Sequence, residues 1–127
     1  MIPADRRYTR DHTWLQAANN IVTVGITDHG QEQLADIVFV DLPDVGRKVK
    51  AGDSLALVET TKTPQAGVPC PITGTVLEVN EELVPHPEKI NESPYEEGWI
   101  FRLKVSNADL SRFMDAAAYE AFLAQKG

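Results

Sequence analysis

Short stretches of alternating apolar and polar residues dominate the chain and predict a mainly β structure. Glycine, proline, asparagine and aspartate separate these stretches, as is typical of tight turns between strands. Asn19 and Asn20 tolerate the positive backbone angles of a tight turn, so we expect a hairpin around them. About seven short strands favour a sandwich or flattened barrel. They are expected at residues 12–16, 21–25, 37–42, around 49, at 55–60, 72–79 and 99–105.

Two segments have helical rather than strand patterning. Asp28 and Gln31 resemble a capping box, which predicts a short helix that ends at Leu34. Asp115 is expected to cap a C-terminal helix with one apolar face toward the sheets. That face consists of Ala118, Tyr119, Phe122 and Leu123.

The remaining long segment, residues 83–93, contains two prolines and is followed by a third, so it is expected to be a surface loop. No composition shift marks a domain boundary. Residues 1–127 are therefore expected to form a single domain.

Composition limits the classes of function. The formal net charge is −7, so phosphate repulsion argues against a nucleic-acid partner. No apolar run is long enough to suggest a membrane span, and the first residues lack the apolar core of a signal peptide. The lone cysteine, Cys70, suits a reducing compartment. We expect a cytoplasmic monomer that binds neither membranes nor nucleic acid.

Lys62 stands out because of its local sequence, Val58-Glu59-Thr60-Thr61-Lys62-Thr63-Pro64. A β-branched strand leads into it, and a proline follows it. The next strand is expected only after Pro71, at residues 72–79, so Lys62 should lie at a turn. An amine that projects from a turn is accessible for acylation.

Several motifs around Lys62 are similar to those of the glycine cleavage H-protein family of lipoyl carriers. The similar segments are Tyr8-Thr9 with His12 and Trp14, residues 24–34, residues 36–43, Ala51-Gly52-Asp53, Val58-Glu59 with Lys62, residues 74–80 and residues 91–99. The resemblance implies a lipoyl/biotinyl-type barrel-sandwich hybrid, or hammerhead. It also implies lipoic acid joined by an amide to Lys62, on a carrier without turnover of its own.

Two departures from the family pattern bear on the cargo. Family members usually have acidic residues at the places of Thr13 and Ala66, where a carboxylate can balance a cationic aminomethyl group. The path from Lys62 to Gly74 is also one residue longer, which suggests a bulge that re-aims the arm. The chain therefore resembles the lipoate-binding proteins that accompany heterodisulfide-reductase-like complexes in sulfur oxidation. We hypothesise a sulfane-sulfur carrier, with a glycine cleavage H protein that serves the P, T and L proteins as the alternative.

The resemblance also assigns roles near the arm. Glu59, three positions before Lys62, is expected to help the lipoate ligase or transferase to recognise the turn. His29 is expected near the cleft in which the arm rests. Cys70, within Pro69-Cys70-Pro71, is a candidate for thiol exchange with the arm or a small buried residue.

Other classes of protein stay open at this point. His12, His29 and His86 lack the spacing of a metal site, so no metal is expected. A hydrolase built on Cys70 and a histidine lacks a nucleophile motif. Biotin acceptors usually have methionine on both sides of the lysine, whereas Lys62 lies between threonines. An unmodified H-like binding protein is the remaining alternative.

Overall fold

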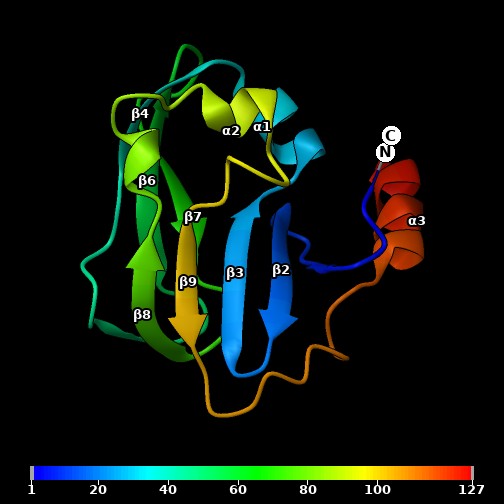
Figure 1. The fold of residues 1–127 in the computed structure, drawn as a ribbon. Coiled ribbons are helices and arrows are strands. Elements are labelled where there is room, and N and C mark those ends of the chain that lie inside the picture. The colour runs from blue at the N-terminus through cyan, green and yellow to red at the C-terminus, as the bar shows by residue number, and fades with distance from the viewer. Residues whose placement is uncertain (1, 127) are drawn as a thin grey trace.

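Two antiparallel β-sheets form most of the structure, a computed structural model that describes residues 2–126 (Figure 1). The larger sheet has the order β1-β2-β3-β9-β8-β5, and the smaller has the order β4-β6-β7. The strands are β1 (Arg7–Tyr8), β2 (Thr13–Ala18), β3 (Ile21–Ile26), β4 (Ile37–Asp41), β5 (Lys48–Val49), β6 (Ser54–Thr60), β7 (Ala66–Pro69), β8 (Gly74–Val79) and β9 (Phe101–Lys104). The predicted mainly β fold is confirmed.

The hairpin predicted around Asn19 and Asn20 joins β2 to β3. Ala18 pairs with Ile21, and Asn19 has the positive φ of 58° that the tight turn requires. The strands around residues 40, 49, 57, 76 and 103 also match the prediction, with ends that differ by one to two residues.

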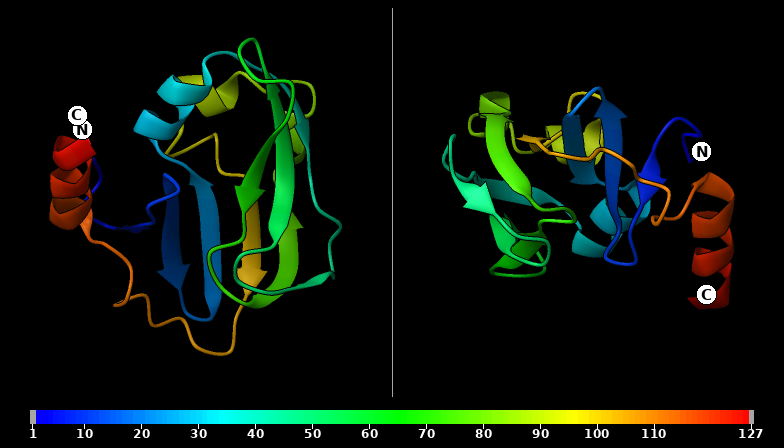
Figure 2. Two further views of the ribbon diagram at one scale, coloured as in Figure 1. Left: turned by 180° about the vertical axis from the view of Figure 1, so that it is seen from behind. Right: turned by 90° about the horizontal axis from the view of Figure 1, so that it is seen from below.

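The main core lies between the two sheets, which pack as layers in the two views of Figure 2. Alternate residues of each strand point inward, so β6 contributes Ala56 and Val58 while Glu59 faces solvent. The larger sheet contributes Val24 and Leu103, both fully buried. Burial of this alternating set is the main stabilisation of the fold.

Helix α1 (Asp28–Leu34) matches the predicted range, but the predicted cap is wrong. Thr27 is the N-cap, and its hydroxyl accepts a hydrogen bond from the Gly30 amide at 3.0 Å. Asp28 instead accepts a bond from the Gln31 side chain at 2.8 Å. Threonine and aspartate are both good caps, and the backbone of Thr27 is the one in the extended conformation that a cap needs.

Helix α3 (Ala116–Lys126) packs beside β1 at the edge of the larger sheet (Figures 1 and 2). The predicted cap is confirmed, because Asp115 accepts a bond from the Ala118 amide at 2.8 Å. Tyr119 is buried in a second apolar cluster with Tyr8 and Trp14. The prediction that Ala118 belongs to this face is wrong, because Ala118 is exposed.

The segment predicted as a loop over residues 83–93 contains regular structure. A 3₁₀ helix, η1 (Glu81–Leu83), leads into it, and α2 (Lys89–Glu92) lies within it. Asn91 donates to the carbonyl of Ala35 at 2.8 Å and accepts from the amide of Ile37 at 2.9 Å. These bonds hold α2 against the start of β4, and they join partners that are far apart in the sequence.

Two strands were not predicted, and one of them changes the surroundings of Lys62. The strand that pairs with β6 after the turn is β7 and not the predicted strand at 72–79, of which residues 74–79 form β8 in the other sheet. β7 escaped prediction because it has four residues, including Gly67 and Pro69, and pairs on one side only. Within residues 2–126, no helix is long and apolar enough to cross a membrane.

Candidate functional site

Lys62 lies in the loop between β6 and β7, and its side chain is exposed. This loop is the highest point of the molecule in Figure 1, and it projects beyond α1 and α2 when seen from behind (Figure 2). Among the described residues, no carboxylate forms an ion pair with Lys62. The amine is therefore free to react at the end of a hairpin, as the sequence predicts.

The hydroxyl of Thr60 organises the turn that carries Lys62. It accepts hydrogen bonds from the amides of Lys62 at 3.1 Å and Thr63 at 2.7 Å. The Thr60 amide donates to the Thr63 carbonyl at 2.9 Å, and the Thr61 amide donates to Asp36 at 3.0 Å. A threonine hydroxyl in this role mimics a backbone turn and lowers the mobility of the anchor. Local sequence patterns did not indicate this role of Thr60.

The register shift in the β6–β7 pairing lies on β6, before Lys62, and not in residues 62–74, where a bulge was suggested. The β6–β7 register is irregular between Ser54 and Ala56, which pair with Pro69 and Val68, so the extra residue belongs to β6. This irregularity is at the base of the hairpin. Closer to the turn, Ala66 pairs directly with Val58. The direction of the Lys62 turn is therefore set by Thr60 and Asp36.

A cleft of ≈ 170 Å³ lies beside the hairpin. Its walls are mainly apolar and include Ile26, Leu34, Val58 and Val68. The rest of the lining is Asp11, His12, Thr13, Gly30, Gln33, Ala66, Gly67 and Pro69. Thr13 and Ala66, the two departures from the family pattern, therefore meet in one cleft.

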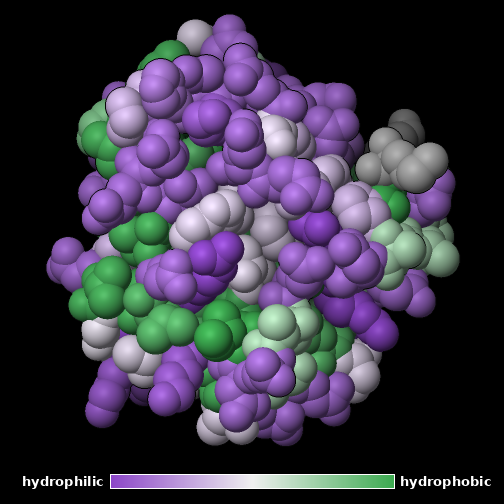
Figure 3. All heavy atoms as spheres, viewed as in Figure 1, coloured by the Kyte–Doolittle hydropathy of each residue, from purple (hydrophilic) through white to green (hydrophobic). Residues whose placement is uncertain are grey.

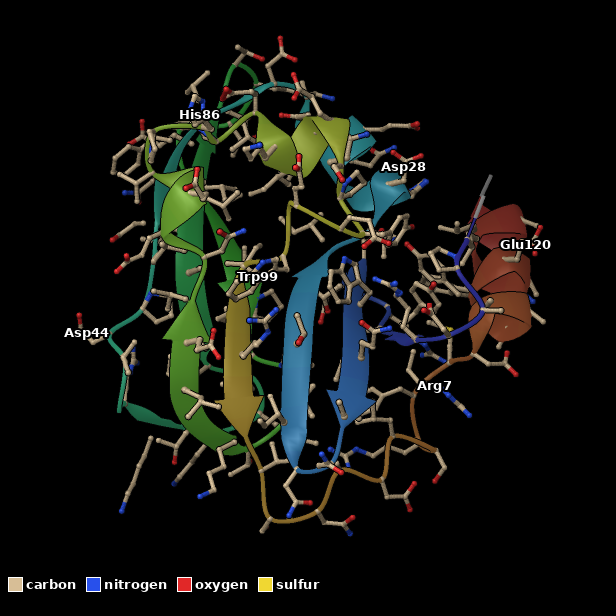
Figure 4. The ribbon with its side chains drawn as sticks, in the orientation of Figure 1. Arg7, Asp28, Asp44, His86, Trp99 and Glu120 are labelled. Carbon is tan, nitrogen blue, oxygen red and sulfur yellow. The ribbon has the colours of Figure 1, made fainter. Side chains whose placement is uncertain are left out.

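Two of the three histidines lie together near this cleft. His12 lines it, and the ring of His29 lies 4.6 Å from that of His12. His29 itself lines an adjoining hollow with Asp28 and Tyr119. His86 pairs with Glu88 at 3.1 Å and lies apart from Asp28 (Figure 4). Within residues 2–126, no three potential metal ligands gather in one place.

Tyr119 connects the C-terminal helix to the cleft wall. Its hydroxyl lies 2.8 Å from His12 Nδ1 and 2.8 Å from the hydroxyl of Thr27. Burial raises the pKa of the Tyr119 phenol to about 12, so the group stays neutral at physiological pH. These contacts fix the orientation of His12. They join positions about 100 residues apart, which sequence spacing did not reveal.

Cys70 is a buried residue of the main core, with 1% of its surface exposed. Its thiol donates to the carbonyl of Ile72 at 3.0 Å, and burial raises its pKa. It borders a second hollow, ≈ 430 Å³ in volume, that shares Thr13 and Pro69 with the cleft. A protonated, hydrogen-bonded thiol is a poor nucleophile, so this environment favours the packing role.

Glu59 is exposed on β6, three residues before Lys62. It pairs across the sheet with Phe39 of β4. Its carboxylate is therefore available to a partner that approaches the turn from the outer face of the small sheet. Its predicted role in recognition stays a prediction.

Comparison with known proteins shows the family. The family model "Glycine cleavage H-protein" matches residues 6–126. The glycine cleavage system H protein of Deinococcus radiodurans is 53% identical over 120 residues, which cover 94% of each chain. That of Anaeromyxobacter sp. (strain K) is 50% identical over 126 residues, 98% of each chain. The crystal structure of an H protein from Mycobacterium marinum matches with a TM-score of 0.88 and 37% identity, over 97% of this chain and 99% of that one. The resemblance predicted from the sequence is confirmed, and the chain belongs to the glycine cleavage H-protein family.

Proposed function

We propose that Lys62 anchors a lipoyl arm and that the protein shuttles aminomethyl groups between the P, T and L proteins of glycine cleavage. Proteins of this family are carriers rather than enzymes, and they hold lipoic acid covalently on a lysine. The observation that carries the proposal is the position of Lys62. It is exposed at the end of a hairpin whose turn is held by side-chain and backbone hydrogen bonds.

A carrier lysine needs an exposed amine and a fixed base. The Thr60 hydroxyl and the Asp36 carbonyl supply the fixed base, because both hold the backbone beside Lys62. A fixed anchor raises the effective concentration of a tethered group at each site it visits. Amide formation would also remove the lysine charge, which eases docking of the arm against an apolar surface.

The adjoining cleft suits an apolar arm. Ile26, Leu34, Val58 and Val68 provide apolar contact along its walls. Once bound, lipoic acid supplies a dithiol that carries the transferred group. The residues of the chain bind the arm, exclude water and orient it.

The partners follow from the same proposal. A lipoate ligase or transferase must act on Lys62, and Glu59 beside the turn is available for its recognition. The P, T and L proteins are the partners of the loaded arm. The predicted cytoplasmic location belongs to this proposal, and the free, buried Cys70 suits a reducing compartment.

The test is ligation followed by loading. Incubation of the full chain with lipoate, ATP and a lipoate–protein ligase should add one lipoyl group, and peptide mapping should place it on Lys62. The Lys62→Arg variant should stay unmodified, while Lys50→Arg, which changes an exposed lysine in another turn, should be modified normally. Modification of Lys62→Arg, or a wild-type chain that stays bare, would show that the anchor lies elsewhere or is absent.

Sulfur transport is the second candidate for the cargo, because Thr13 and Ala66 lack the carboxylates that family members usually have there, which leaves Asp11 as the acidic residue in the cleft lining. The family match and the relatives above give it no support, and they favour the aminomethyl cargo. The lipoylated protein should therefore be offered glycine with P protein, and separately a persulfide donor. Intact mass should show the aminomethyl adduct. A sulfur adduct without an aminomethyl adduct would favour sulfur transport over glycine cleavage.

The absence of a carboxylate at positions 13 and 66 has a consequence that the loading assay can measure. Two opposite charges about 4 Å apart attract by roughly 4 kcal/mol at an effective dielectric constant of about 20, and an open cleft reduces this value. We therefore expect Ala66→Asp to slow the loss of the cationic cargo by about tenfold. Ala66→Asn is the matched control and should leave the rate of loss near that of wild type.

A further inference from the structure

The outer face of the small sheet, next to Lys62, combines exposed apolar side chains with carboxylates. Phe39 of β4 is 48% exposed and pairs across the sheet with Glu59 of β6. Two pairs further from the turn, and so on the same face, Asp41 pairs with Leu57, which is half-buried. Apolar and acidic side chains thus alternate over two adjacent strands. We call these four residues, Phe39, Asp41, Leu57 and Glu59, the outer patch.

A β-bulge in β4 contributes to this exposure. Ile37 pairs with Thr60 and Phe39 pairs with Glu59, so Val38 is one extra residue on β4. The bulge breaks the alternation and leaves two consecutive apolar residues, Val38 and Phe39, about half exposed. Bulges often protect the edge of a sheet from pairing with another chain, and charged side chains usually accompany them. Here the bulge exposes Val and Phe instead, which is typical of a contact surface.

The patch lies close to the reactive amine. Glu59 precedes Lys62 by three residues, which is about 10 Å along an extended strand. A partner that covers Phe39 and Glu59 is therefore within reach of Lys62. On the face seen in Figure 3, which carries the larger sheet, the upper end is mostly hydrophilic and an apolar band lies over the lower part of the sheet.

We propose that the outer patch is the docking surface for the enzyme that acylates Lys62. This inference rests on the proposed function. The acylating enzyme must bring the Lys62 amine itself into its active site, so it has to contact the hairpin beside the turn. Partners of the loaded arm instead act on its dithiol, at the far end of a long tether. The two carboxylates specify a complementary surface, an apolar hollow flanked by lysine or arginine.

The reaction at the docked turn is an acyl transfer without redox change. The neutral Lys62 amine attacks the carbonyl carbon of a lipoyl acyl adenylate. The carbon–nitrogen amide bond forms and the carbon–oxygen bond to phosphate breaks. The nucleotide phosphate leaves with the bonding electron pair, and the amine proton passes to solvent. The outer patch contributes binding and placement only.

The test is steady-state ligation of the apo chain by a purified lipoate–protein ligase with lipoate and ATP. Phe39→Thr removes the aromatic contact and introduces a β-branched residue, a type that is favoured in strands. Asp41→Lys reverses one charge of the patch. We expect each variant to raise the KM for the apo protein by about tenfold and to change kcat by less than twofold, because an anchor contributes to binding and not to the chemistry.

Matched controls lie on the connection from β4 to β5. Val45 is 62% exposed, so Val45→Thr removes an apolar side chain of similar exposure. Asp44 projects from that connection, so Asp44→Lys makes the same change in net charge (Figure 4). Both controls should keep the KM of wild type. Thermal unfolding should show that all four variants are folded.

Four results would decide between these possibilities. A KM that stays within twofold of wild type for Phe39→Thr and Asp41→Lys would overturn the docking surface, while Lys62 remains the anchor. An equal rise in the KM of the two control variants would overturn it too. Variants lipoylated to completion with excess ligase should turn over normally with the P, T and L proteins. If these lipoylated variants were instead impaired about tenfold with the P, T and L proteins, the outer patch would be a docking surface for those enzymes. A wild-type chain that never accepts lipoate would refute the proposed function itself.

Discussion

The Thr60 hydroxyl offers a direct test of how the Lys62 turn is held. Thr60→Val keeps the size and β-branching of the side chain and removes the oxygen that accepts from the Lys62 and Thr63 amides and donates, over a longer 3.4 Å, to the Thr63 carbonyl. The bond from the Thr60 amide to the Thr63 carbonyl stays. Thr60 is 8% exposed, but the turn around it faces water, which can replace part of what is lost. Two hydrogen bonds at the lower end of the usual range give a destabilisation of about 1 kcal/mol.

This loss should be local. Hydrogen exchange of the Lys62 and Thr63 amides should become about fivefold faster, which corresponds to about 1 kcal/mol. The Thr61 amide donates to Asp36 and serves as an internal control, because Thr60→Val leaves that bond in place. Thr61→Val, at an exposed position, is the matched variant and should leave all three amides unchanged. Unaltered exchange at Lys62 and Thr63 in Thr60→Val would refute our account of the turn.

Three further predictions concern stability and reactivity. Gly25→Ala should lower the free energy of unfolding by about 1–3 kcal/mol in a denaturant titration, because an added Cβ would lie 2.6 Å from the Trp14 ring. Since the pKa of Tyr119 is raised in the folded protein from 10.0 to about 12, its contribution to stability is complete below pH 10 and is lost as the pH rises toward 12. Tyr119→Phe should weaken that alkaline loss in thermal unfolding scans, and an unchanged profile would contradict this origin. Cys70 should resist iodoacetamide at pH 8 in the native protein and react after unfolding, since it is buried and its pKa is raised. Rapid alkylation of the native protein would support a role of Cys70 in thiol exchange.

The sequence predicted the strands and helices whose own residues carry a clear pattern of apolar and polar positions. Alternation in β3 and β6 predicts strands because the same residues are buried by the opposite sheet. β7 was missed because its four residues include glycine and proline, and the pairing partner β6 decides its conformation. The cap of α1 was misassigned because Thr27 and Asp28 are equally suitable by type. Only the backbone conformation distinguishes them.

The candidate site also has one part that local sequence patterns predict and another that they do not. Lys62 could be predicted, because the strand before it and the proline after it lie within a few residues. The cleft could not be derived from local patterns, since its walls come from β2, α1 and β7. The position of Thr13 opposite Ala66 depends on how the two sheets pack. The bond between Tyr119 and His12 likewise depends on where α3 docks.

The small sheet separates the two kinds of partner that a carrier must serve. Neighbouring residues of β6 point to opposite faces, so Val58 lines the cleft whereas Leu57 belongs to the outer patch. A change on one face should therefore leave the other function intact. Phe39→Thr should slow ligation without changing the rate of cargo loss. Ala66→Asp should slow cargo loss without changing ligation.

The double variant tests this separation. Changes at independent sites add in free energy, so Phe39→Thr with Ala66→Asp should show the ligation defect of the first and the cargo retention of the second, each within twofold of the single variant. The assays are the KM for ligation and the rate of cargo loss after full lipoylation. A coupling larger than tenfold in either assay would mean that the two faces communicate through β6. The acylating enzyme and the loaded arm would then compete for one surface.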